Sequence, residues 1–385
     1  VGQDFSRVWP GFNTQMPIVL NYPEGPKTFN VDSKLPAGIE KIALAPEFKV
    51  GDEIVFVMRY QDSFTFLHEL FHRFQKDHFD FKESEGYPDL YNPENQALMQ
   101  IEEEILLKYA KDRTDFLKND YLLVRKYRMS RISEASLIFE DREERLEGLA
   151  NFVAMKATNN IKPVIVLLEG LVKDQNVIDK SLKWRFYATG ALMGMMLDRE
   201  GKEWKQAVLC HSLFSQFAII EDKVHLQELF EKYRFDEKKE AMTHQIEMIK
   251  KGVDRLQSEY KNSPGYEVHI SYSSSLSSGG TVDKILALNE NEKVALKESG
   301  RTESDEWVLE TREIPFIFKT KQALIFKLQD SIEVDGRRVK IENMRDPVPF
   351  KEIAWSDNKT RFKSKKEGVL IPHENYMEIS FQAFD

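Results

Sequence analysis

The sequence predicts an α+β chain of more than one domain. A small sheet over residues 1–60 joins a mostly helical region over residues 61–261, and an all-β domain follows over residues 266–385. Short apolar runs separated by Pro and Gly predict the first part, apolar residues three and four apart predict the second, and alternating apolar and polar residues predict the third. A length of 385 residues with 41% hydrophobic side chains also suits two domains better than one.

Three apolar runs predict the N-terminal sheet. They are residues 17–20, 42–45 and 54–58, and Gly51-Asp52 is a turn signal before the last run. Helical spacing begins next, because Asp62 or Ser63 can cap a helix with one apolar face, formed by Phe64, Leu67, Phe71 and Phe74.

Further helices are expected around residues 98–105 and over residues 133–158, 181–197 and 204–217. A last long helix carries one apolar seam, formed by Met242, Ile246, Ile249, Val253, Leu256 and Tyr260. Because this seam spans fewer than about three heptads, we expect it to pack on the same chain rather than in a coiled coil.

The run Asn262-Ser263-Pro264-Gly265 ends the helical region. Residues 266–272 then alternate as a strand, and the residues 273–280, almost all Ser and Gly, predict a flexible turn. Asp335-Gly336 predicts a hairpin turn. Further strands are predicted at residues 324–328, 332–334 and 377–381. The C-terminal region is therefore interpreted as a β-sandwich-like domain.

Charge and cysteine content exclude several classes of protein. The 64 acidic and 55 basic side chains give a net charge of −9 without a basic tract, which argues against nucleic acid as a partner. No apolar run is long enough to predict a transmembrane segment. The single Cys210 excludes a disulfide framework and a cysteine-cluster metal site. The start at Val1 and the added β-domain fit an enzyme of the bacterial periplasm or cell surface, and a fragment of a cytoplasmic enzyme fits nearly as well.

The segment that carries chemical information is His68-Glu69-Leu70-Phe71-His72. Residues four apart share one face of a helix, so His68 and His72 can hold one Zn²⁺ ion per chain. Glu69 can then take a proton from water as the general base. The alternative is an amphipathic helix whose histidines have no metal to bind.

A catalytic zinc site has three protein ligands and one open position. Glu147 is the preferred third ligand, because Gly148 and Ala150 beside it would let its helix approach the motif helix closely. His78 is excluded by its position on another part of the first helix. The alternatives are Glu143, Glu144 and His211, with Glu134 and Glu140 further back along the chain.

Carboxylates that do not bind the metal can still accept a hydrogen bond from a ligand histidine, a role that such sites usually fill. In contrast, Glu102-Glu103-Glu104 is expected to lie on a solvated helix face.

The two segments 68–72 and 147–152 together resemble the glutamate-ligand zinc peptidases, the gluzincins. Glu147-Gly148-Leu149-Ala150-Asn151-Phe152 is similar to the Glu-Gly-Phe-Ala segment of the membrane-alanyl aminopeptidase group, where that Glu is the third zinc ligand. The resemblance implies a zincin-like catalytic domain and a peptide or protein substrate. By analogy with zincins, residues 42–45 or 54–58 offer a strand edge to an extended peptide.

Amide hydrolysis also needs a donor for the developing oxyanion, and Tyr187 is the candidate. It lies on a predicted helix with Gly190, Ala191 and Gly194 on the same side, a face suited to tight packing. The alternative is a packing role for Tyr187 beside Trp184 and Phe186, and His211 is a second candidate donor.

The sequence thus predicts a zinc metallopeptidase. A zinc hydrolase of a non-peptide amide and a non-catalytic binding protein on a zincin scaffold are the alternatives.

Overall fold

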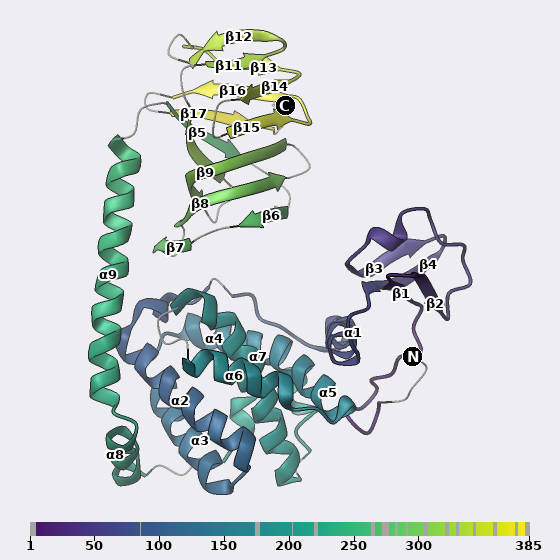
Figure 1. Ribbon diagram of the computed structural model, residues 1–385, viewed down its shortest axis with the longest axis vertical. Helices are drawn as coiled ribbons and strands as arrows, with labels where there is room; N and C mark the ends of the chain where they lie inside the picture. The colour runs from purple at the N-terminus through teal and green to yellow at the C-terminus, as the bar shows by residue number, and fades with distance from the viewer. Residues whose placement is uncertain are drawn as a thin grey trace. The chain divides into compact units, whose positions relative to one another are not determined.

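The computed structural model has an α+β fold with a small N-terminal sheet, a helical middle and C-terminal strands, as the sequence predicts (Figure 1). Its residues group into two compact units, Val1–Ile246 and Glu247–Asp385. The structure describes residues 5–84, 86–173, 178–201, 203–218, 222–262, 266–271, 277–281, 284–289, 292–303, 307–319, 323–328, 331–341, 344–356, 360–373 and 376–381.

The N-terminal sheet has the strand order β2-β1-β4-β3. β1 and β4 pair in parallel, and the other neighbours are antiparallel. Because β4 lies inside the sheet, the prediction that residues 54–58 form an edge is wrong, whereas β3 is an edge strand. The strands are β1 (Ile18–Tyr22), β2 (Gly25–Phe29), β3 (Leu44–Val50) and β4 (Glu53–Arg59).

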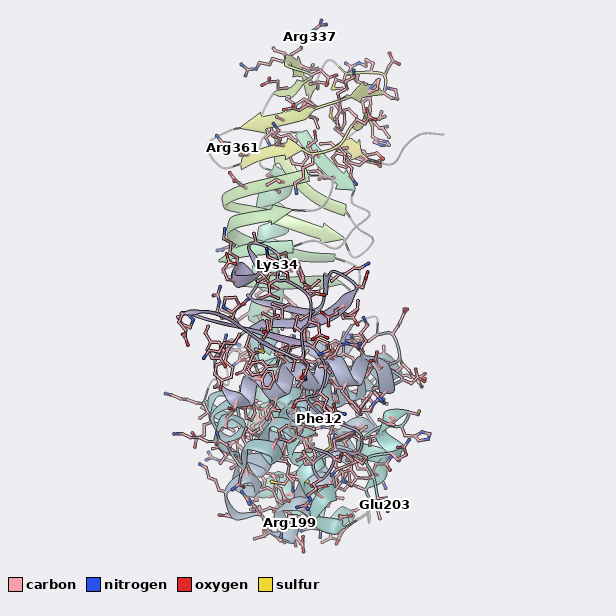
Figure 2. All side chains as sticks on the ribbon, turned by 90° about the vertical axis from the view of Figure 1, so that its right-hand side faces the viewer. Phe12, Lys34, Arg199, Glu203, Arg337 and Arg361 are labelled. Atoms are coloured by element: carbon pink, nitrogen blue, oxygen red, sulfur yellow. The ribbon has the colours of Figure 1, made fainter. Side chains whose placement is uncertain are left out.

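Both faces of this sheet are covered, because successive strand residues point to opposite sides. Phe56 and Met58 join the large core of the helical region, whereas Val55 and Val57 lie in a second small cluster. Figure 2 shows how side chains fill the interior of the first unit, as at the fully buried Phe12.

The helical region begins with α1 (Ser63–His78), whose N-cap is Asp62, as predicted. The Asp62 side chain accepts a hydrogen bond from the Thr65 backbone N–H at 2.9 Å. On the apolar face of α1, Phe71 is fully buried and its ring centre lies 5.2 Å from that of Trp9 and 5.3 Å from that of Phe12. These aromatic contacts fix the rotation of α1 about its axis, and with it the direction of the His68 and His72 side chains.

The later helices pack beside α1 and against one another. The predicted helix 133–158 is present, with a π-helical turn (Glu144–Gly148) between α4 and α5. The helices are α2 (Pro93–Asp112), α3 (Asp115–Met129), α4 (Glu134–Glu143), α5 (Leu149–Thr158), α6 (Lys162–Lys173), α7 (Ile178–Glu200), α8 (Lys223–Lys232) and α9 (Phe235–Asn262).

The predicted helix at residues 204–217 is wrong. The segment contains only two short 3₁₀ turns, Ala207–Leu209 and Phe214–Gln216. Its buried apolar residues, Trp204, Val208, Leu213 and Phe217, are four or five positions apart, so they imitate a helical period along an irregular path over the core.

The first part of the α9 seam packs on the same chain. Met242 and Ile246 are buried, and Gln100 of α2 lies 3.5 Å from the Met242 sulfur. The side chains of Leu256 and Tyr260 lie outside the described residues.

In the C-terminal unit, ten strands form one continuous path, β12-β11-β14-β15-β9-β10-β5-β17-β16-β13, and β8 pairs with β6, β7 and β9 beside it. The predicted hairpin at Asp335-Gly336 joins β11 to β12, and both turn residues have positive φ. Ser277–Thr281 forms β6, so the predicted turn over residues 273–280 is wrong there, and residues 272–276 lie outside the described residues.

The strands of this unit are β5 (Tyr266–Ser271), β6 (Ser277–Thr281), β7 (Lys284–Asn289), β8 (Glu292–Glu303), β9 (Trp307–Lys319), β10 (Ala323–Leu328), β11 (Ser331–Val334), β12 (Arg337–Lys340), β13 (Val348–Phe350), β14 (Ile353–Ser356), β15 (Thr360–Ser364), β16 (Gly368–Pro372) and β17 (Tyr376–Ser380). Among the described helices of the whole chain, none has both the length and the apolar character needed to cross a membrane.

A network of buried charges joins α2, α3, α4 and α7. Arg128 Nε lies 2.6 Å from Glu102 Oε1, and Arg185 also contacts Glu102. Arg185 Nη1 lies 2.7 Å from Glu103 Oε1. Glu102 is fully buried, so the prediction of a solvated face is wrong for Glu102 and Glu103. The buried negative charges of Glu102 and Glu103 are tolerated because both side chains pair with arginines.

We expect Glu102→Gln to lower the free energy of unfolding by about 3 kcal/mol, because Arg128 and Arg185 would stay buried without the charged carboxylate that both contact. Chemical denaturation measures this change. Glu104→Gln is the matched control, since Glu104 is partly exposed and pairs with Lys238 at 2.7 Å. It should change the free energy of unfolding by less than about 1 kcal/mol. Equal small losses for both variants would place Glu102 on a solvated face after all.

Candidate metal centre

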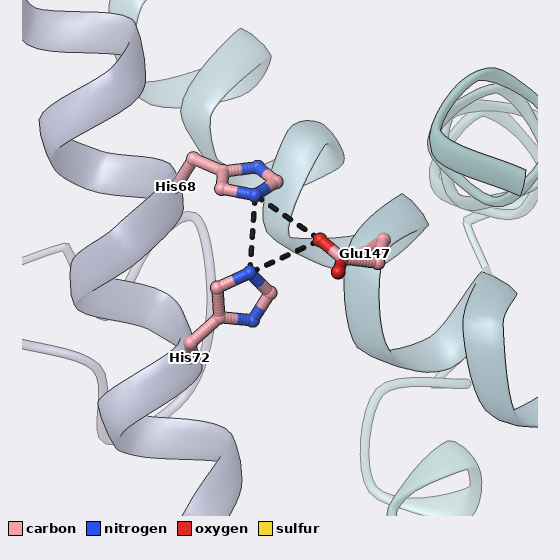
Figure 3. Close-up of side chains that lie close together, drawn as sticks. All are labelled: His68, His72 and Glu147. Atoms are coloured by element: carbon pink, nitrogen blue, oxygen red, sulfur yellow. Dashed lines mark hydrogen bonds and ion pairs between the residues drawn. The ribbon is translucent and has the colours of Figure 1, made fainter. Parts of the chain in front are cut away.

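The structure brings His68, His72 and Glu147 together (Figure 3). The two histidines extend from one face of α1, and Glu147 extends from the π-helical turn between α4 and α5. The two Nε2 atoms lie 3.0 Å apart, and Glu147 Oε2 lies 3.4 Å from His68 Nε2 and 3.2 Å from His72 Nε2. Ligand atoms held about 2.0–2.1 Å from one tetrahedral zinc ion lie about 3.3 Å from one another. The three separations fit such an ion.

The π-helical turn holds Glu147 through its contact with α7. A Cβ atom on Gly148 would lie 2.5 Å from the Gly190 Cα, and one on Gly190 would lie 2.4 Å from the Glu144 carbonyl oxygen. Both positions therefore need glycine. The sequence predicted that Gly148 would let its helix approach the motif helix. The helix that follows Gly148, α5, does pack against α1, but the close contact at Gly148 itself is with α7.

Two amide side chains orient the histidines. The Gln75 NH₂ group donates to the carbonyl oxygens of Arg145 and Leu146, at 2.7 and 2.8 Å, so its oxygen faces His72 Nδ1 at 2.8 Å. In the same way, Asn151 donates to the Tyr187 carbonyl oxygen at 3.3 Å and presents its oxygen to His68 Nδ1 at 2.8 Å. Each Nδ1 therefore carries the proton, and each Nε2 has a free lone pair.

This arrangement leaves three electron-rich atoms facing one another. The two Nε2 lone pairs are 3.0 Å apart, and Glu147 Oε2 is buried without a hydrogen bond of good geometry. A proton or a metal ion is needed between them, because buried lone pairs at this distance repel. The donor set of two imidazoles and one carboxylate is one that zinc accepts. The residues present therefore fit a zinc ion.

Electrostatics in the metal-free cluster agree with this interpretation. Burial alone would raise the pKa of Glu147, but the adjacent His68 and His72 hold it far below its ordinary value. Burial likewise acts to lower the pKa of His72, but Glu147 and Gln75 raise it overall. The cluster thus favours positive charge at its centre.

Tyr187 and Glu69 border the cluster. The Tyr187 ring stacks on His68 with ring centres 5.5 Å apart, and its hydroxyl interacts with the Glu147 carboxylate. Burial and this carboxylate raise the pKa of Tyr187, so the hydroxyl keeps its proton. Glu69 is half-buried, and its charge acts on both His72 and Tyr187.

The alternative ligands are engaged by other partners or exposed to solvent. Glu144 points into the charge network, where it contacts Arg125 at 2.7 Å and Thr189 at 2.6 Å. Glu143 accepts a hydrogen bond from Arg142 at 2.5 Å, and Glu140 is paired with Arg128. Glu134 and His211 are exposed, and so is His78, which its position on α1 already excluded.

The expectation that a carboxylate would orient a ligand histidine is wrong, because Asn151 and Gln75 take that role. Asn151 lies in the segment 147–152, one of the two on which the resemblance to gluzincins rests, and Gln75 lies one turn beyond His72 on α1. A glutamine at this helical spacing is a weak signal by itself, since only the carbonyl groups of Arg145 and Leu146 fix its orientation.

Comparison with known proteins gives no match: no family model, curated protein or solved structure matches the chain. The resemblance to gluzincins rests on the residues themselves.

We expect Asn151→Leu to weaken zinc binding about 10- to 100-fold, because His68 would lose the acceptor that fixes its tautomer and ring orientation. Titration against a competing chelator measures the dissociation constant, and circular dichroism checks that the variant is folded. Gln216→Leu is the control, since the hydrogen bonds of its side chain to described residues reach the nearby loop atoms of Ser212 and Ser215. A folded Asn151→Leu variant with wild-type zinc affinity would contradict the assignment.

Proposed function

We propose that this protein is a zinc-dependent peptidase whose metal ligands are His68, His72 and Glu147. The observation that carries the proposal is the triangle of three ligand atoms, 3.0 to 3.4 Å apart, with Glu147 Oε2 buried and without a hydrogen-bond partner. A site of two histidines and one glutamate leaves one position of a tetrahedral ion open. The chain resembles gluzincins at these same residues.

Glu69 is the proposed general base. It follows His68 on α1, and its charge acts on both His72 and Tyr187, so its carboxylate borders the cluster. A purely structural metal site has no use for a general base at this position, which favours catalysis over a binding role. Glu69 takes a proton from the attacking water and passes it to the leaving amine.

Bound zinc would act as a Lewis acid on the scissile carbonyl and would lower the pKa of a coordinated water towards 7. Tyr187 supports the same reaction, because its raised pKa keeps a proton on the hydroxyl that can be donated to a developing oxyanion. The edge strand β3 is the proposed binding edge for an extended peptide, by pairing of backbone groups.

Glu69→Gln should keep zinc bound and lose about 10²- to 10⁴-fold in turnover, because the amide cannot accept the proton. The measurement is mass spectrometry of products from a diverse peptide mixture, with zinc content determined in parallel. Cleavage by the wild type should stop on addition of a chelator. Full activity in Glu69→Gln would remove Glu69 from the mechanism, and loss of zinc would make Glu69 a ligand instead.

Zinc affinity should fall as the pH decreases through the raised pKa of His72. Below that pKa the metal-free site holds a proton on His72, and zinc must displace it, so affinity should drop about tenfold per pH unit. Above it, affinity should level off. Dissociation constants between pH 6 and 8, about the range in which histidine titrates, check this. An affinity independent of pH would show that His72 does not compete for a proton with the ion.

A further inference from the structure

A lysine stands at the rim of the metal cluster. Lys183 Nζ lies 3.3 Å from Glu147 Oε1, the carboxylate oxygen that is not directed at the histidines. The Lys183 side chain is 62% exposed, whereas that of Glu147 is 10% exposed. The ammonium group therefore reaches the cluster from the solvent side, where a substrate would enter.

The position of Lys183 follows from α7. Lys183 and Tyr187 are one helical turn apart, and Lys183 Nζ lies 5.7 Å from the centre of the Tyr187 ring, which stacks on His68. Trp184 is 51% exposed, and its ring centre lies 5.3 Å from that of Tyr187. On the α7 side, the rim of the site is thus formed by one cation and one exposed aromatic ring.

The charges around a bound divalent ion leave Lys183 without a full counter-charge. Glu147 and Glu69 together balance the two positive charges of the ion, and the histidines are neutral as ligands. Glu143 is also near Lys183, but it is engaged by Arg142 at 2.5 Å. With the ion in place, repulsion between the ion and the ammonium offsets much of the attraction that Glu147 offers to Lys183.

We infer that Lys183 binds a carboxylate of the substrate close to the scissile bond, an inference that rests on the proposed peptidase function. The Lys183 ammonium lies beside the outer oxygen of the Glu147 carboxylate. Among the described residues, it is the one lysine or arginine side chain placed against Glu147. An anionic group next to the scissile carbonyl would restore the charge balance. A chain-terminal carboxylate and an Asp or Glu side chain share this chemistry.

The test uses three ligands on the zinc-loaded full chain. Each joins a hydroxamate, which binds zinc, to a short peptide: one ends in a free carboxylate, one ends in a carboxamide, and one ends in a carboxamide but carries an aspartate side chain. Calorimetry measures their dissociation constants. We expect at least one acidic ligand to bind about five- to tenfold more tightly than the neutral one. Which acidic ligand gains identifies the source of the carboxylate.

Lys183→Met should abolish this difference between acidic and neutral ligands. Lys156→Met is the matched control, because Lys156 is also partly exposed and pairs with Asp198 at 3.0 Å, and it should keep the difference. Trp184→Ala, a change at the adjacent residue of α7, should keep it as well.

Equal affinities in the wild type, or a difference that survives in Lys183→Met, would overturn the inference while zinc binding and hydroxamate binding stand. Failure of the wild type to bind zinc would overturn the proposed function, and the inference with it.

Discussion

The close contact between Gly148 and Gly190 is the constraint on which the candidate site depends. It presses the π-helical turn against α7, and no side chain larger than hydrogen fits at either position. The turn then directs two neighbouring carboxylates in opposite directions. Glu144 reaches Thr189 and Arg125, whereas Glu147 reaches the histidines of α1.

The contact between Gly148 and Gly190 also sets α7 beside the cluster, which brings Tyr187 to His68 and Lys183 to Glu147. An extra residue in a helix, as in a π-helical turn, is often found at functional sites for this reason.

The first unit contains two clusters of buried charged groups, and the carboxylates of the two clusters have different partners. In the network behind the π-helical turn, three arginines (Arg125, Arg128 and Arg185) face four carboxylates (Glu102, Glu103, Glu140 and Glu144). One negative charge is unmatched, and burial raises the pKa of both Glu103 and Glu144, which allows a proton to supply the difference. Around Glu147 no buried arginine is found among the described contacts, and the partners are two imidazoles with lone pairs directed inward. That donor set could hold a cation, so its chemistry matters more than its burial.

The hydrogen bonds around the histidines connect the candidate site to the backbone of the elements that carry Glu147 and Tyr187. Gln75 ties His72 to the carbonyl groups beside Glu147, and Asn151 ties His68 to the carbonyl of Tyr187. The orientation of the two histidines and the placement of α5 and α7 therefore depend on the same hydrogen bonds. A change in either amide alters both the tautomer of a histidine and the spacing of two elements.

The sequence by itself determined the local features: the capped helix at Asp62, the pair of histidines on one helical face, the strands with period two, and the hairpin at Asp335-Gly336. Each depends on residues close together in the chain, so spacing predicts it. Glu147 was also predicted from the sequence, because glycine beside a carboxylate in a helix requires an explanation.

Only the tertiary structure decided the rest. The burial of Glu102, the irregular path of residues 204–217, the use of amides rather than carboxylates behind the histidines, and the approach of Lys183 all depend on residues far apart in the chain. A polar side chain has the same spacing on a solvated face as on a buried one, and its partners across the fold determine which it becomes.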